Sequence, residues 1–316
     1  MPRLAALAWL GTDGRYEVAY RSLPRDDNAT WRFVTVPEPT GAAYAGTEEF
    51  DLEVIGDDGL GLAFRDQRGA LRILQTASLS EGGWTLEDID TGGPADDGAN
   101  CPPELRGAQS APGVGIDPEL AVRDEALVVA YQDADCGDLR IARRVSRRWS
   151  IAIADAGEIS LETGAARGIV GRWPSVDIGP GGVVAVAYHD VSRGRLLYAR
   201  EIDGRYEIEV VDAGVEIDAF SRERKDVVGA FASLSRTDGG AVTITYFDGT
   251  ELDLEMAQRA SPTAPWTHRK VESEGAVGFF ADHAQSDGAG RFVAAERLVP
   301  SGGGFASSLF VEREGP

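Results

Sequence analysis

The sequence GGVVAVAYHD at residues 181–190, followed by GRLLYAR at residues 194–200, decides the fold of this chain. Side chains alternate between the two faces of a β-strand, which places Ala187 and His189 on one face and Tyr188 on the other. The polar residues 191–193 between the two runs are typical of a tight turn. The stretch therefore predicts a β-hairpin.

Near-copies of this hairpin recur along the chain at a spacing of roughly 55 residues. The second strand of each copy begins at Gly14, Gly69, Gly137, Gly194, Leu252 and Ser307. The interval from Gly69 to Gly137 is longer than the others, which indicates an insertion near residues 93–112. The regular spacing makes the chain a repeat protein.

Three further signals recur in phase with the hairpin. A small residue and a glycine open a strand before it, an aromatic residue opens a strand after it, and its first strand ends in aromatic-x-Asp. The small-Gly pairs are Ala45-Gly46, Val114-Gly115, Val170-Gly171, Val228-Gly229 and Val277-Gly278; the opening aromatics are Trp31, Trp84, Trp149, Tyr206 and Trp266; the aspartates are Asp66, Asp133, Asp190 and Asp248. Each repeat therefore predicts four short strands, A to D, and no stretch shows a sustained helical period.

Six such units predict an all-β chain folded as a single β-propeller domain. The repeats span approximately residues 1–40, 41–92, 113–158, 168–214, 226–273 and 275–316. Six blades are therefore expected, with five or seven as alternatives. The first and last repeats supply only three strands each. An open solenoid is the competing repeat architecture. The aromatic residues that open strand D are expected to pack between neighbouring blades.

The amino-acid composition restricts the classes of partner and the location that we expect for this chain. The formal net charge of −21 argues against nucleic acid as a partner and leaves cations or basic partners open. No run approaches the roughly 18 apolar residues that would span a bilayer. Cys101 and Cys136 lie in polar stretches, which favours one disulfide over two unpaired thiols. A disulfide in turn indicates an oxidising compartment. We therefore expect a secreted or envelope-associated protein whose signal lies outside this chain.

The pattern V-A-Y-x-D-x-x-x-G-x-L-x-Y-A at residues 186–199, with an aromatic-led strand after it, resembles the blades of uncharacterised exported bacterial β-propellers. These are sometimes grouped with the sialidase-like superfamily. The resemblance covers nearly the whole chain and concerns the fold. For a sialidase it would imply an arginine triad and a Tyr/Glu nucleophile pair, but the S-x-D-x-G-x-T-W boxes are missing. An acidic site would also repel an anionic sugar.

The repeated polar residues are expected on one face, around the mouth of the central channel. They are Asp66, Asp133, Asp190 and Asp248 between strands B and C, and Glu119, Ser175, Ser233 and Asp282 near the start of strand A. One hypothesis is that the four aspartates hold Ca²⁺. The other is that each accepts hydrogen bonds from the N–H groups of its own turn. An aspartate present in most blades favours the second.

Residues that break the pattern are the better candidates for a ligand site. Trp173 interrupts the opening of strand A beside Arg172, and a tryptophan next to an arginine suits stacking on a sugar ring. His189 is absent from the other repeats, where Arg65, Gln132 and Phe247 take its place. The candidate ligand-binding residues are Trp173, Arg172, His189, Asp190, Asp282, His283 and Glu119.

These observations predict a monomeric binding module that recognises a carbohydrate or protein ligand at an acidic channel mouth, with bound calcium as a further hypothesis. Catalysis is not expected, because G-x-S-x-G, H-E-x-x-H and P-loop signatures are missing. The alternative is a propeller hydrolase, of glycosidase or metal-dependent lactonase type, that uses two ring carboxylates. A scaffold without a small-molecule site is the third hypothesis.

The disulfide prediction can be tested by intact mass. If Cys101 and Cys136 are bonded, reduction raises the mass of the denatured protein by two hydrogen atoms, and alkylation labels both cysteines only after reduction. Labelling of both cysteines without reductant would contradict the bond.

Overall fold

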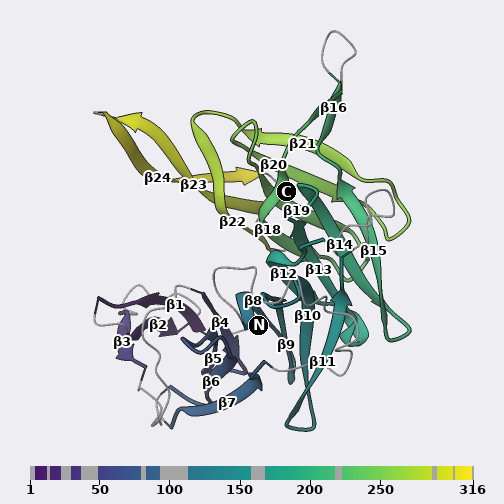
Figure 1. The fold of residues 1–316 in the computed structure, drawn as a ribbon. Helices are drawn as coiled ribbons and strands as arrows, with labels where there is room; N and C mark the ends of the chain where they lie inside the picture. The colour runs from purple at the N-terminus through teal and green to yellow at the C-terminus, as the bar shows by residue number, and fades with distance from the viewer. Residues whose placement is uncertain are drawn as a thin grey trace. The chain divides into compact units, whose positions relative to one another are not determined.

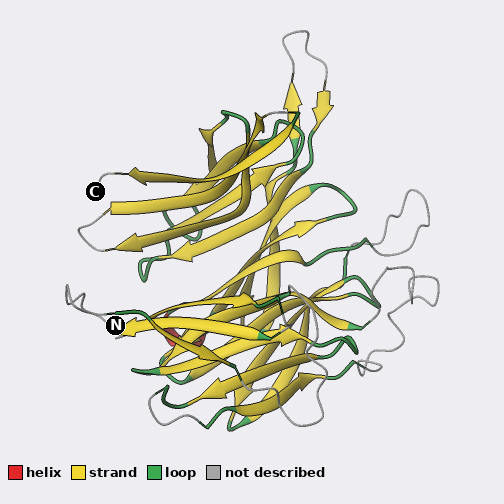
Figure 2. Ribbon diagram, turned by 90° about the vertical axis from the view of Figure 1, so that its left-hand side faces the viewer, coloured by secondary structure: helices red, strands yellow, loops and turns green. Residues whose placement is uncertain are grey.

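The computed structural model describes residues 4–12, 15–22, 30–36, 49–79, 83–92, 113–157, 168–217, 223–286, 290–301 and 303–314. Strands form nearly all of their regular structure (Figure 2). Within these ranges one 3-10 turn, Pro180–Gly182, is the only helical segment. None of the described helices is long and apolar enough to cross a membrane.

Six antiparallel sheets are the blades of a β-propeller, and they follow one another along the sequence (Figure 1). The first and last have three strands and the four between them have four. This confirms the predicted all-β propeller with six blades and three-stranded terminal blades. A two-stranded hairpin outside the blades, β16 (Val215–Ile217) with β17 (Glu223–Lys225), was not predicted.

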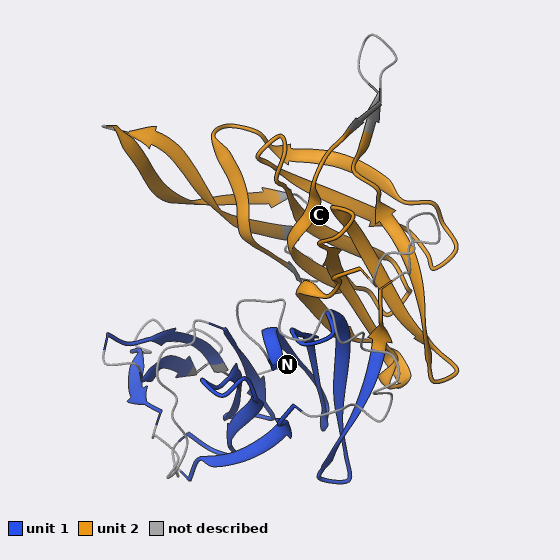
Figure 3. Ribbon diagram, in the orientation of Figure 1, with its two compact units in different colours: residues 1–153 blue, residues 154–316 orange. Residues whose placement is uncertain are grey.

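The chain divides into two compact units, residues 1–153 and 154–316 (Figure 3). Each is described by itself, and the single-domain assignment stays a prediction. Unit 1 contains blades 1 and 2 and nearly all of blade 3. Blade 1 consists of β1 (Leu4–Leu10), β2 (Tyr16–Ser22) and β3 (Arg32–Thr35), and blade 2 of β4 (Phe50–Ile55), β5 (Gly59–Arg65), β6 (Leu71–Thr76) and β7 (Thr85–Asp90). Blade 3 consists of β8 (Val114–Arg123), β9 (Ala126–Asp133), β10 (Asp138–Val145) and β11 (Arg148–Asp155).

Unit 2 contains the last three blades. Blade 4 consists of β12 (Arg172–Ile178), β13 (Val184–Asp190), β14 (Arg195–Ile202) and β15 (Arg205–Asp212). Blade 5 consists of β18 (Val228–Arg236), β19 (Val242–Asp248), β20 (Asp253–Arg259) and β21 (Thr267–Glu272). Blade 6 consists of β22 (Ala276–Ser286), β23 (Gly290–Ser301) and β24 (Gly304–Glu314). In blades 2 to 6 the first strand is strand A, so β12, β18 and β22 correspond to β8 of unit 1.

The hairpin predicted at residues 181–200 is β13 paired with β14, in the register Tyr188 to Leu197 and Asp190 to Arg195. Every residue of β13 is buried, because both faces of a blade pack against other strands. Ala185 and Ala187 belong to an apolar cluster shared with β18 and β19 of blade 5. A strand buried on both faces reads as a nearly continuous apolar run, as this one does.

Three of the aromatic residues that open strand D, Trp84, Trp149 and Trp266, pack between blades, as predicted. Trp149 packs against the cluster shared by blades 2 and 3, and Trp266 against that of blades 4 and 5. Each indole N–H also donates to a glutamate of the preceding blade, Glu87 and Glu209 respectively, at 3.3 Å in both cases. The same polar contact thus recurs in both units.

A close approach between blades explains why glycine opens strand A. Gly229 has φ of 95°, and a Cβ there would lie 2.7 Å from the Cα of Leu196, at the start of strand C in the preceding blade. Gly115 and Gly278 repeat this arrangement, with a Cβ at 3.3 Å from the Cα of Leu71 and Leu254. Only glycine combines this backbone conformation with so short a contact.

We expect Gly229→Ala to lower the free energy of unfolding by about 2–4 kcal/mol, from the left-handed conformation and the overlap with Leu196 together. Gly181→Ala is the matched control, because Gly181 also has positive φ, 71°, but nothing lies within 4 Å of its Cβ position. It should cost only about 1–2 kcal/mol. Urea unfolding of both variants measures the difference, and equal losses would contradict the role of the contact.

Candidate functional site

The four repeated aspartates hold their own turns. Each accepts backbone N–H groups from the B–C turn that follows it, at 2.8 to 3.4 Å. The donors are Arg68 and Ala70 for Asp66, Asp135 and Cys136 for Asp133, Arg193 for Asp190, and Thr250 and Glu251 for Asp248. Arginines pair with three of them, at 2.6 to 2.8 Å, namely Arg72, Arg140 and Arg195. These contacts support the turn-capping interpretation.

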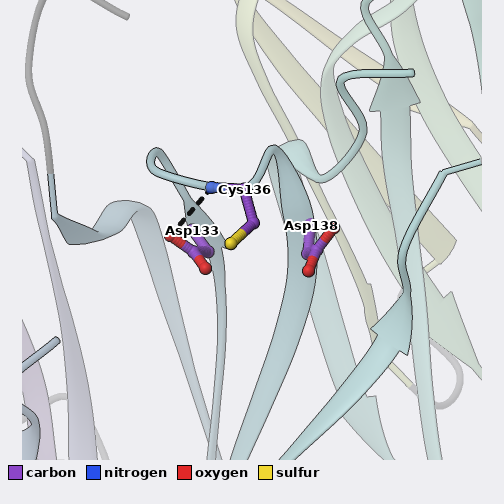
Figure 4. A group of neighbouring side chains, drawn as sticks. All are labelled: Asp133, Cys136 and Asp138. Atoms are coloured by element: carbon purple, nitrogen blue, oxygen red, sulfur yellow. Dashed lines mark hydrogen bonds between the residues drawn. The ribbon is translucent and has the colours of Figure 1, made fainter. Parts of the chain in front are cut away.

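Asp133 belongs to a group that could ligate a metal, with Cys136 and Asp138 (Figure 4). Their ligand atoms lie within 4.8 Å of one another. However, Asp133 already accepts from Arg140 at 2.6 Å, and burial raises its pKa in spite of that arginine. A Cys136 sulfur in a disulfide would not be a thiolate ligand. Cys101 lies outside the described residues, so the disulfide stays a prediction, as does calcium at the four aspartates.

His189 connects blade 4 to blade 5. Its side chain is 4% exposed, and Nδ1 lies 2.8 Å from the carbonyl oxygen of Val228, directly before the glycine that opens β18. Since a carbonyl only accepts, Nδ1 carries the hydrogen. In blade 2, Arg65 occupies the same position and donates to the carbonyl of Val114, before the glycine of β8, at 3.0 Å. His189 therefore makes a contact that another blade makes with a different residue.

The candidate residues near the start of strand A also connect blades. Ser175 accepts from the backbone N–H of Leu234 at 3.0 Å, and Ser233 accepts from that of His283 at 3.3 Å. Asp282 accepts from the hydroxyl of Ser233 at 3.0 Å. These residues lie within strand A, not in the loop before it. Their hydrogen bonds place strand A of one blade against strand A of the next.

A further link between blades was missed in the sequence. The tyrosine of aromatic-x-Asp donates its hydroxyl, at 2.7 Å, to an aspartate that ends strand D. The pairs are Tyr131 with Asp90 in unit 1, and Tyr188 with Asp155 and Tyr246 with Asp212 in unit 2. The other oxygen of each aspartate accepts from a glycine N–H two residues on. The repeated Asp-x-Gly at 90–92, 155–157 and 212–214 could have revealed this link.

Strand A of blades 3 to 6 contains a β-bulge that holds a residue in the left-handed region. The pairing register shifts between Ile116 and Glu119 in β8, Arg172 and Ser175 in β12, Ala230 and Ser233 in β18, and Phe279 and Asp282 in β22. The residues with positive φ at this position are Asp117 at 47°, Trp173 at 45°, Phe231 at 52° and Phe280 at 49°. Aspartate tolerates this conformation, but bulky aromatic residues there are outliers. All three aromatics lie in unit 2.

The three aromatic rings form one cluster, named here the bulge cluster: Trp173, Phe231 and Phe280. The ring centroids of Trp173 and Phe231 are 4.7 Å apart, and those of Phe231 and Phe280 are 4.8 Å apart. Phe280 is 70% exposed, and the other two are half-buried. The Arg172 guanidinium lies 4.8 Å from the Trp173 ring centroid. The cluster thus presents partly exposed aromatic surface next to a cation.

The structure brings some of the predicted ligand residues together. Trp173 contacts Arg172, and its ring centroid is 5.6 Å from that of His189. Asp282 is exposed and follows Phe280 by two residues on β22, whereas His283 is buried against Ser235 and Thr245. Asp190 is fully buried in its turn, and Glu119 lies on β8 of unit 1. Phe231 and Phe280 were missed, although both follow the predicted glycine by two residues, as Trp173 does.

No family model and no curated protein matches this sequence. Several solved structures are similar in fold. A mutant of Aleuria aurantia lectin in complex with alpha-methyl-L-fucoside is 13% identical with a TM-score of 0.47, over 99% of this chain and 96% of the lectin. A thermostable family-43 glycoside hydrolase is 12% identical with a TM-score of 0.44, over 85% of this chain and 92% of the enzyme. These values are too low to transfer a function.

The contact of His189 predicts a dependence of stability on pH. Burial lowers the pKa of His189, so the unfolded chain binds a proton more readily than the folded chain. The stability that neutral His189 contributes is therefore complete above pH 6.5 and decreases as the pH falls below it.

We expect His189→Gln, which keeps a donor but does not titrate, to lose less stability than the unchanged protein between pH 7 and pH 5. The difference is about 1.4 kcal/mol for each unit of pKa shift. Urea unfolding at several pH values measures it. Parallel pH profiles would contradict the prediction.

Proposed function

We propose that the protein is a carbohydrate-binding β-propeller that holds its ligand on the bulge cluster of unit 2. The observation that carries the proposal is the presence of three bulky aromatics at positive φ, at the same position of three consecutive blades, with their rings in contact. Such strained residues concentrate at ligand-binding sites, where the strain is retained because it orients a side chain.

The chemistry of the cluster suits a sugar. A pyranose has an apolar face of C–H groups that can cover an aromatic ring, and a rim of hydroxyls that needs hydrogen-bonding partners. Trp173, Phe231 and Phe280 supply the rings, while Arg172 and Asp282 supply a donor and an acceptor at either end of the row. Aromatic surface with a few placed polar groups is the usual composition of such sites.

The strain favours a functional role over packing. A non-glycine residue in the left-handed region costs about 1–2 kcal/mol, and glycine, asparagine or aspartate would avoid most of that cost. Blade 3 does so with Asp117. Trp173 and Phe231 are half-buried and also contact the rings of His189, Phe247 and Phe279. Phe280 is 70% exposed, so stability alone would not favour an aromatic residue at that position.

The hydrolase is the competing hypothesis, and it needs two carboxylates that flank the bond to be cleaved. Asp66, Asp133, Asp190 and Asp248 accept hydrogen bonds from their own turns, which explains their recurrence without a catalytic role. This supports the binding module over the hydrolase. The proposal further includes relation to exported sialidase-like propellers, secretion or attachment to the envelope, and a monomeric state without affinity for nucleic acid. Calcium and the disulfide belong to it as stabilising features.

Replacement of Phe280 by asparagine separates binding from stability. We expect Phe280→Asn to weaken glycan affinity about five- to tenfold, the contribution of one aromatic contact. The free energy of unfolding should stay equal or rise by up to about 1 kcal/mol, because asparagine relieves the strain. A glycan array identifies the ligand, and calorimetry measures the affinity of both proteins.

Phe305→Asn is the matched control, because Phe305 is 74% exposed on β24 but is not part of the cluster. It should leave glycan affinity unchanged. A protein that binds no glycan on the array, or that loses affinity equally in both variants, would contradict the proposed site. Hydrolysis of aryl glycosides or lactones by the unchanged protein would favour the competing hypothesis.

A further inference from the structure

We infer that the bulge cluster prefers glycans that carry a free amino group, such as glucosamine oligomers, over neutral or N-acetylated ones. This inference rests on the proposed carbohydrate site and names its class of ligand. It is based on Asp282, which follows Phe280 by two residues on β22 and is exposed to solvent. The Cα atoms of two such residues lie no more than about 7 Å apart.

Asp282 differs from its counterparts in the two preceding blades. Ser175 and Ser233 use their single oxygen to accept an N–H group of the next strand A. In the part of the chain that the structure describes, no strand A follows β22. Asp282 accepts from Ser233 through Oδ1, and its Oδ2 has no partner among the described residues. Asp282, an exposed residue two positions after Phe280, therefore has one carboxylate oxygen without a contact to a described blade.

The surroundings of Asp282 do not neutralise it. The side chain of His283, the next residue, is buried against Ser235 at 2.6 Å and Thr245 at 3.3 Å. The nearest cation of the cluster, Arg172, lies over Trp173, which is separated from Phe280 by Phe231. No ion pair of Asp282 is present among the described residues.

A cation at this end of the cluster gains from two sources. The face of an aromatic ring attracts a cation, and an exposed carboxylate can form a charge-assisted hydrogen bond with an ammonium group. The net charge of −21 raises the local concentration of cations around the whole chain. A protonated amino sugar combines an ammonium group with a sugar face that can stack, so it satisfies the rings and Asp282 together.

Three tetrasaccharides with the same β-1,4 backbone provide the test. They carry an ammonium, an acetamide or a hydroxyl group at C2: glucosamine tetramer, its N-acetylated form and cellotetraose. At pH 6 and low salt, calorimetry with the full chain should give the glucosamine tetramer an affinity at least about tenfold above the other two. Added salt should reduce this preference, because part of it is electrostatic.

Asp282→Asn should abolish the preference and leave the weaker binding of the neutral oligomers unchanged. Asp203→Asn is the matched control, since Asp203 is exposed in the β14–β15 turn and its replacement changes the net charge equally. It should keep the preference. Circular dichroism confirms that both variants are folded.

The outcomes separate this inference from the proposed function. Equal affinity for the three oligomers, a preference that survives in Asp282→Asn, or no binding of the glucosamine tetramer would overturn the inference. If other glycans on the array still bind and require Phe280, the carbohydrate site stands without the preference. If no glycan binds at all, both fail.

Discussion

The contact between the glycine that opens strand A and the leucine that starts strand C of the preceding blade is the constraint on which the other blade contacts depend. Gly229 brings its backbone against Leu196, and the carbonyl just before it, that of Val228, becomes the acceptor for His189. In unit 1, Gly115, Leu71 and the carbonyl of Val114 repeat the arrangement. A side chain at the glycine would separate the strands and lengthen these hydrogen bonds together.

The same close approach precedes the backbone conformation of the bulge cluster. After the glycine, strand A contains a bulge, so a second residue with positive φ follows two positions later. The repeat fixes this conformation but not the residue type, which is aspartate in β8 and aromatic in β12, β18 and β22. The strain costs about 1–2 kcal/mol at each aromatic residue. Trp173 and Phe231 recover part of it in ring contacts with His189, Phe247 and Phe279, whereas Phe280 is 70% exposed.

The repeat, the strand order and the three-stranded terminal blades were predictable, because hydrophobic periodicity and turn residues are local signals. The contacts between blades were less so. The other repeats have no histidine at the position of His189, yet Arg65 makes the equivalent contact in blade 2, since different side chains can reach equivalent carbonyl oxygens. Phe231 and Phe280 were missed because a strict alternation of faces does not account for a bulge. Trp173 was recognised because it interrupts the repeated pattern at the opening of strand A, beside Arg172.

Polar residues that recur in several blades are therefore a poor guide to function in such a chain. The turn and blade contacts of Asp190 and Asp212 satisfy their carboxylates locally. Functional residues are better sought at positions where the repeat fixes the backbone conformation but the side chain is not the one that gives the highest stability. Phe280 and Asp282 on β22 meet this criterion, Phe280 by its strained conformation and Asp282 by an oxygen that contacts none of the described blade residues. Their proximity on one strand makes them the centre of the proposed site.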